Sequence, residues 1–310
     1  MKYIKDLKEF DNVADAYLVI NCVKGLSTNN MSYLSITLQD CTGQIEGKKW
    51  EAKPEDVETF AVGNIVYVQG EVLSYRNALQ IKIASGSKMD ADIDPKLYTL
   101  SAPIPQDKLE QKLLTYINSI KDGDCQAIVK HIVNKYYKDF VEYPAAVRNH
   151  HEYTNGLLFH TISMADLCEH VCECYPTLDR DMLLSGVLLH DIGKTIELSG
   201  PIIPKYTTEG KLLGHISIMS AIIKETVDEL QLTSEVGLLL QHMILSHHGR
   251  QDYGSPVLPL TKEAVILNMI DDMDAKMTIL DKVLKDVKEG EFSSKVFPLD
   301  ERCFYKPKSR

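Results

Sequence analysis

The sequence lacks long apolar runs, a cysteine framework and an excess of positive charge. No apolar run approaches the ~18 residues that a membrane span needs, and the opening MKYIKDLKEF has no apolar core of a signal peptide. The seven cysteines are an odd number without a paired spacing, which is atypical of a disulfide scaffold. A reducing cytoplasm is therefore the expected location, with no membrane partner.

The net charge of -10 argues against a general surface for polyanions. Nucleic acid can still bind through a local groove or a metal site. The hydrophobic content of 44% and the charged content of 25% are ordinary for a globular protein, and a chain of 310 residues favours two domains.

Histidine is absent before His131, and all ten histidines lie between His131 and His248. Within this region, the stretch LLSGVLLHDIGKTIE (183–197) has apolar residues at helical spacing that stop at His190 and Asp191. An unpaired carboxylate is costly to bury, so Asp191 is expected to be solvated or bound to a cation. Imidazole and carboxylate are usual ligands of divalent metals, which makes this pair a candidate metal site.

The order of histidines and acids along the chain resembles that of the HD-domain metallophosphohydrolases: a His, a His-Asp pair, further histidines and then an Asp. In that family the paired Asp bridges two divalent ions, and the resemblance implies the same here. The alternative, that each histidine is a satisfied core residue, must explain five matches in the right order. The implied ligands are His160, His190, Asp191 and Asp271 for one ion, and Asp191, His215 and one or both of His247 and His248 for the other.

Three residues close in sequence to the implied ligands, Gly193, Lys194 and Asp274, are expected to support the site. Lys194 lies three residues beyond Asp191 and can reach a phosphate oxygen as a point charge, so it is a candidate catalytic and substrate-binding residue. Its alternative is a solvated lysine past a helix end, where lysine is favoured anyway. Gly193 is expected to end the helix that carries the His-Asp pair. Asp274, one turn after Asp271, is expected to contact a metal ligand or, alternatively, to form a surface salt bridge.

The other histidines have less specific settings. His150 and His151 are expected to line the substrate cleft, or alternatively to lie in a surface loop. His242 is expected to be a hydrogen-bonded histidine in the core or behind a ligand. His131 and His170 are expected to be structural.

Residues 1–88 show the alternation of apolar and polar residues that is typical of β-strands, as in Leu34, Ile36 and Leu38. Five strands in about ninety residues fit a small barrel. The stretch YLSITLQDCTGQIEG (33–47) resembles the second and third strands of OB-folds that bind single-stranded nucleic acid, which track the backbone with basic groups and stack bases on aromatic rings. The candidate contacts are Tyr33, Lys48, Lys49, Trp50, Tyr75 and Arg76.

Two observations weaken this assignment. Basic and acidic residues are nearly balanced within residues 1–88, and Trp50 can instead plug an end of the barrel. The assignment of nucleic-acid binding to the barrel therefore rests mainly on the domain that follows it in the chain.

The remaining segments complete the predicted organisation. Residues 89–105 are rich in Ser, Asp and Pro and are expected to form a linker. Residues 106–290 show helical spacing throughout, and residues 291–310 are expected to be a solvated C-terminal tail. The predicted fold class is α+β with two domains, a small all-β OB-fold barrel followed by an all-α HD domain.

This domain order resembles the YhaM-type 3′→5′ exoribonucleases of Gram-positive bacteria. The likeness runs through nearly the whole chain and includes NHHEY (149–153), GLLFHT (156–161), LHDIGK (189–194), ELSGP (197–201), GHIS (214–217) and LSHHG (245–249). It implies hydrolysis of single-stranded RNA, and also of single-stranded DNA as an open alternative, to nucleoside 5′-monophosphates. It implies manganese as the ion, with cobalt, iron or magnesium as alternatives.

The sequence is also compatible with two other functions. One is an HD phosphohydrolase of small nucleotides with a regulatory barrel, and the other is a non-catalytic RNA-binding protein with a structural metal site. The loop 199–213, between two ligand-bearing helices, is expected to border the substrate cleft. A homo-oligomer is compatible with the sequence.

Overall fold

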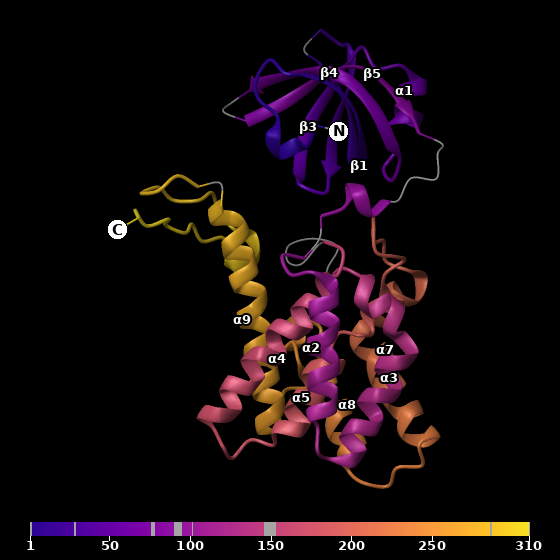
Figure 1. Cartoon of the computed structure of the whole chain (residues 1–310), viewed down its shortest axis with the longest axis vertical. Helices are drawn as coiled ribbons and strands as arrows, with labels where there is room; N and C mark the ends of the chain where they lie inside the picture. The colour runs from indigo at the N-terminus through magenta and orange to yellow at the C-terminus, as the bar shows by residue number, and fades with distance from the viewer. Residues whose placement is uncertain are drawn as a thin grey trace. The chain divides into compact units, whose positions relative to one another are not determined.

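The computed structural model describes residues 2–27, 29–75, 78–89, 95–100, 102–145, 153–285 and 287–309. The chain divides into two compact units, residues 1–101 and 102–310 (Figure 1). Across the described ranges, none of the helices combines the length and the apolarity that crossing a membrane requires.

The first unit is a closed five-stranded barrel in the order β1-β2-β3-β5-β4. The β3 and β5 strands pair in parallel, and the other neighbours are antiparallel. The predicted five-stranded barrel is therefore confirmed. Its strands are β1 (Asn12–Leu26), β2 (Ser32–Asp40), β3 (Gly43–Trp50), β4 (Ile65–Tyr75) and β5 (Ala78–Lys88), with short helices η1 (Ile4–Asp6), α1 (Pro54–Thr59) and η2 (Pro95–Tyr98).

The alternation of the sequence is what fills this barrel. Leu34, Ile36 and Leu38 of β2 are buried, because residues two apart on a strand share one face. Phe60, which follows α1, is fully buried against β5, where a Cβ atom on Gly86 would lie 2.3 Å from the Phe60 ring. Trp50 is 46% exposed, so the alternative that it plugs the barrel is wrong.

The second unit is helical and is built around α5, whose residues Met182–Leu189 are all buried. A helix that is apolar on all sides has to be surrounded, and α5 packs against α3, α4, α8 and α9. Asp179 begins α5 by accepting a hydrogen bond from the Met182 backbone N–H. The helices are α2 (Gln106–Ser119), α3 (Gly123–Glu142), α4 (Gly156–Cys174), α5 (Arg180–Leu189), α6 (Lys194–Glu197), α7 (Thr208–Glu229), α8 (Val236–Ser246) and α9 (Lys262–Lys285), with η3 (Gln251–Tyr253) and η4 (Phe297–Leu299).

The segment after α9 folds back on the end of that helix. Phe292 pairs with Tyr305 as an antiparallel bridge, and the two extended stretches run side by side at the yellow end of the chain in Figure 1. Val296 and Leu299 form a small apolar cluster with Ile279 of α9. Val296 and Leu299 therefore anchor this segment on α9, while most of its other described residues are exposed.

The Phe60 side chain is expected to contribute strongly to barrel stability. Replacing a buried Phe by Ala typically costs about 3–5 kcal/mol, because apolar contacts are lost and a cavity remains. Phe60→Ala should lower the free energy of unfolding by that amount in urea titrations. Trp50 is the single tryptophan, so its fluorescence reports on the barrel.

Val57→Ala is the matched control, because Val57 lies in α1 and is largely exposed. It should change the midpoint little. Equal effects of the two substitutions would contradict the assignment of Phe60 as a core residue of the barrel.

Candidate metal centre

The turn that follows α5 carries the His-Asp pair. α5 ends at Leu189 with His190 as its C-cap residue, and α6 begins at Lys194 after a turn. Gly193 has right-handed backbone (φ -55) at the start of α6, so the expectation that Gly193 ends the helix is wrong. A Cβ atom on Gly193 would instead lie 2.4 Å from the His215 carbonyl oxygen. The glycine therefore permits close approach of the α7 backbone to the turn that contains Asp191.

Five histidines around this turn share one hydrogen-bonding pattern. In each, Nδ1 contacts a carbonyl or carboxylate oxygen, and because these oxygens accept, Nδ1 carries the proton and donates. Each second nitrogen, Nε2, is thereby left to act as a metal ligand. The contacts are His160 to Asp274 Oδ2 (2.7 Å), His190 to Val187 O (2.8 Å), His215 to Glu197 Oε1 (3.1 Å), His247 to Ile244 O (2.7 Å) and His248 to Tyr253 O (2.7 Å).

The Asp191 carboxylate lies between two groups of these imidazoles. Its Oδ2 atom is 3.4 Å from His190 Nε2 and 3.8 Å from His160 Nε2. Its Oδ1 atom is 3.5 Å from His215 Nε2 and 3.9 Å from His247 Nε2. The structure thus brings the predicted ligands together around one carboxylate. Two sets, each with ligand atoms within 4.8 Å of one another, have the composition of a metal site: His160, His190 and Asp191, and His215, His247 and His248.

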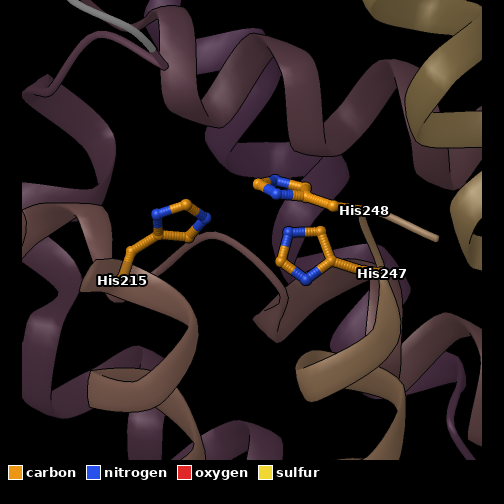
Figure 2. Close-up of side chains that lie close together, drawn as sticks. All are labelled: His215, His247 and His248. Atoms are coloured by element: carbon orange, nitrogen blue, oxygen red, sulfur yellow. The ribbon is translucent and has the colours of Figure 1, made fainter. Parts of the chain in front are cut away.

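Figure 2 shows how two helices supply the second set. His247 and His248 follow α8, and their rings face that of His215, which projects from α7 on the opposite side. The ring centroid of His215 is 5.7 Å from that of His247 and 5.3 Å from that of His248. Gly214 breaks α7 with φ +71, a backbone conformation that favours glycine, so His215 begins a new helical stretch.

Two aspartates on one face of α9 complete the first set. Asp271 Oδ1 is 3.3 Å from His160 Nε2, and Asp274, three residues on, contacts Nδ1 of the same ring. The expectation that Asp274 contacts a candidate ligand is confirmed, and the surface salt bridge is wrong. Asp274 holds the ring so that its other nitrogen faces Asp191.

The cluster fits a divalent cation. Among the side chains that the structure describes, Asp191 Oδ1, His215 Nε2 and His247 Nε2 are buried and have no hydrogen-bond partner. A buried polar atom without a partner is costly. A bound divalent cation would give all three a partner, and imidazole with carboxylate is a donor set that divalent ions accept.

The protonation states of Asp191 and His247 also suit the binding of a divalent cation. Burial opposes ionisation of Asp191, but Lys194 and His190 outweigh it and hold the pKa of this carboxyl well below its usual range. Burial and the neighbouring His248 lower the pKa of His247 well below its usual value, which keeps this imidazole neutral. Ionised carboxylates and neutral imidazoles are the forms that bind metal.

His160 is the exception in the metal-free protein. Burial lowers its pKa, but Asp271 and Asp274 overcome this effect and raise the pKa of His160 to about 9. The two carboxylates therefore favour the protonated form of this ring, and binding of a metal here would release a proton.

Lys194 lies beside Asp191, and its side chain is 12% exposed. Its Nζ atom lies 2.6 Å from Asp191 Oδ2, so the alternative of a solvated lysine is wrong. Burial disfavours the ammonium form, but Asp191 raises the pKa of Lys194 above its usual value, and the lysine stays charged. Contact with a phosphate remains a prediction.

On the barrel, the predicted contact residues divide between two faces. Tyr33 and Trp50 are opposite one another on β2 and β3, with ring centroids 5.1 Å apart. Lys48 lies on the same face, with Nζ 5.4 Å from the Tyr33 centroid. Lys49 pairs with the buried Leu34, so strand alternation places it on the opposite face.

The Tyr33 ring is held by its neighbours. Gly25 pairs with Tyr33 across β1 and β2, and a Cβ atom there would lie 2.5 Å from the ring. The ring thus covers the glycine on one side and meets Trp50 on the other. Tyr75 is exposed at the end of β4. The candidates Arg76, His150 and His151 lie outside the described residues.

The remaining histidines have local partners. His242 Nε2 accepts a hydrogen bond from the Leu260 backbone N–H at 2.9 Å, which confirms that it is hydrogen-bonded. His131 is 3.0 Å from Glu229, and His170 is 3.5 Å from Glu173 on an exposed part of α4.

Two family models match this chain. The HD domain model matches residues 157–276, which span the cluster from His160 to Asp274. The model of the OB-fold nucleic acid binding domain matches residues 22–86 of the barrel.

Whole-chain relatives agree with both matches. The 3′-5′ exoribonuclease YhaM of Bacillus licheniformis is 46% identical over 306 residues, and those of Bacillus velezensis and Bacillus subtilis are 45% identical over the same length. Each alignment covers 97% of both chains. The chain belongs to the YhaM family of 3′-5′ exoribonucleases. The family resemblance of the sequence is thereby confirmed.

One residue of this YhaM-family centre escaped sequence reasoning. Glu197 Oε1 accepts hydrogen bonds from both the backbone N–H and Nδ1 of His215, each at 3.1 Å. Burial raises the pKa of Glu197, but His215 outweighs it and lowers the pKa below its usual value. The signal was an acid between Ile196 and Leu198, because an acid in an apolar stretch needs a partner.

Glu197→Ala should weaken divalent metal binding at the His215 set by about 10- to 100-fold, the usual loss when the partner of a ligating histidine is removed. Glu197→Gln keeps an acceptor oxygen and should retain most of the affinity. Manganese titrations followed by calorimetry measure both effects.

Glu225→Ala is the control, since Glu225 is exposed on α7, the helix that carries His215. If Glu197→Ala binds manganese as the wild type does, Glu197 does not position His215.

Proposed function

We propose that this protein is a metal-dependent 3′→5′ exoribonuclease that shortens single-stranded RNA, and also single-stranded DNA, by releasing nucleoside 5′-monophosphates. One observation carries the proposal: two sets of imidazoles face the two oxygens of Asp191, in a chain whose relatives named 3′-5′ exoribonuclease YhaM align over 97% of its length.

The cluster would hold two divalent ions, most suitably manganese, with cobalt, iron or magnesium as alternatives. Asp191 offers one oxygen to each set, so it is the residue that would be shared. When bound, such ions activate a water for attack on phosphorus and neutralise charge on the phosphate. The proposed ligands are His160, His190, Asp191 and Asp271 for the first ion, and Asp191, His215, His247 and His248 for the second.

Residues near the cluster would guide the RNA end. Lys194 holds Asp191 ionised and is proposed to contact a phosphate oxygen. His150 and His151 are proposed to line the cleft. The segment 199–213 connects Glu197 to the part of α7 that carries His215, which supports a place for it at the border of the cleft.

The barrel would hold RNA upstream of the reacting end. Tyr33 and Trp50 present adjacent rings on one face, which suits stacking of successive bases. Lys48 lies over the Tyr33 ring and donates a hydrogen bond to Ser35 Oγ at 2.6 Å, which places its charge beside the rings. A phosphate next to a stacked base would meet this ammonium group.

Asp191→Ala is expected to abolish stepwise shortening of 5′-labelled single-stranded RNA in the presence of manganese, because both ions lose a shared ligand. Binding of the same RNA by the barrel should persist. Asp228→Ala, at an exposed position of α7, should shorten RNA as the wild type does.

A wild-type protein that leaves RNA intact would contradict the proposal in one of two ways. Hydrolysis of free nucleotides alone would identify a small-nucleotide phosphohydrolase. RNA binding without hydrolysis of either substrate would identify a binding protein with a structural metal.

Trp50→Ala should weaken binding of single-stranded RNA by about 5- to 150-fold, which corresponds to about 1–3 kcal/mol for one stacked base. Fluorescence anisotropy with labelled RNA, in chelator to prevent cleavage, measures this loss. Tyr67→Ala, on β4 and similarly accessible, is the control. Equal affinities of the two variants would remove Trp50 from the RNA-binding face.

A further inference from the structure

The metal centre needs a cation for the phosphates that flank the reacting one. The chain has a net charge of -10, and Asp191, Asp271 and Asp274 surround the first set of imidazoles. Lys194 is largely buried, and its ammonium group is already paired with Asp191. A second positive charge close to the centre would offset these carboxylates and help to hold a flanking phosphate.

The loop 249–255 follows His248 along the chain and is hydrogen-bonded to the ring of that histidine. His248 Nδ1 donates to the Tyr253 carbonyl oxygen at 2.7 Å. The Arg250 carbonyl oxygen accepts from the backbone N–H groups of Tyr253 (3.1 Å) and Ser255 (3.2 Å). Gly254 turns the chain with φ +98 and lies against the same imidazole. The loop backbone and the His248 ring are thus one hydrogen-bonded unit.

Gly249, the first residue of the loop, is held in place by Asn268 of α9. Asn268 Nδ2 donates to the His247 carbonyl oxygen at 2.8 Å. Gly249 has φ +75, and a Cβ atom there would lie 2.6 Å from the Asn268 amide. Asn268 precedes Asp271 by about one turn on the same helix, so this contact links the loop to the helix that carries a proposed ligand.

Arg250 is the cation that this loop presents. Its side chain is exposed, and it makes no ion pair within the described part of the chain, whereas Arg180 and Arg302 each contact carboxylates. Two residues span at most about 7 Å, so the Arg250 backbone is close to that of His248. A guanidinium group binds a phosphate through two parallel hydrogen bonds, which a lysine ammonium cannot do.

Tyr253 lies one short helical turn from Arg250 and has an exposed ring. The side chain is 64% exposed, and only its backbone oxygen is used by His248. An aromatic ring beside a guanidinium group offers a face to a base and a fork to the adjoining phosphate.

We propose that the loop 249–255 binds the 3′-terminal nucleotides of the RNA, with Arg250 on a phosphate that flanks the reacting one and the Tyr253 ring stacked on a base. This inference rests on the proposed exonuclease function. It adds a substrate-binding element that is coupled to the metal centre through His248.

Arg250→Gln tests the phosphate contact in the full-length, manganese-loaded protein. We expect KM for single-stranded RNA to rise at least about tenfold, which is near the lower end of the range for a charge-assisted hydrogen bond, while kcat stays unchanged. The slope of log KM against log salt should fall by about 0.7, the value for one phosphate contact on a single strand. Manganese affinity should be unchanged, because Arg250 is not a proposed ligand.

Arg302→Gln is the control, since Arg302 pairs with Val296 in the segment that packs on Ile279. Ile279 itself lies about 12 Å beyond Asp271 along α9. It should leave KM and the salt slope unchanged. Tyr253→Leu should raise KM by about 5- to 150-fold without changing the salt slope, because stacking involves no counterion release.

The outcomes separate the two proposals. Wild-type protein that does not shorten RNA overturns both the exonuclease function and this inference. Wild-type protein that shortens RNA, with Arg250→Gln retaining the wild-type KM and salt slope, overturns this inference alone.

Discussion

The Asp191 carboxylate is the constraint on which the helical unit depends. A buried negative charge is costly unless cations or donors surround it, and here an ammonium group and four imidazoles lie within 4 Å of its two oxygens. The fold serves this arrangement. The buried stretch Met182–Leu189 of α5 delivers the carboxylate to the interior, and Gly193 lets the α7 backbone approach it.

The outer contacts of the imidazoles are as specific as the inner ones. Asp274, Glu197 and three carbonyl oxygens each accept from an Nδ1 atom and so direct five Nε2 atoms inward. Such partners fix the tautomer and the ring orientation, which together determine whether a ligand is ready for a metal. The proposed substrate loop uses the same device, because the carbonyl that orients His248 belongs to Tyr253.

Sequence reasoning predicted what depends on local pattern and residue chemistry. Alternation in Leu34, Ile36 and Leu38 gave the strands, and helical spacing before His190 gave α5. The ligand candidates were found because the order of histidines and aspartates resembles that of the HD-domain metallophosphohydrolases. The family comparison then agreed with the resemblance that those motifs suggested.

What the sequence did not reveal depends on approach between distant segments. Phe60, rather than Trp50, fills the barrel, because Gly86 on β5 leaves space for its ring. Gly193 makes room for His215 instead of ending a helix. Glu197 meets His215 only after the chain has returned through α7. The local sequence can show that a residue such as Glu197 needs a partner, but it does not show which distant residue that partner is.

The most direct test of the account is the anomalous scattering of manganese in crystals of the protein. The account predicts two peaks, one on each side of Asp191, with His160, His190 and Asp271 around one and the remaining three imidazoles around the other. Peaks located elsewhere, or a single ion that Asp191 does not contact, would contradict it.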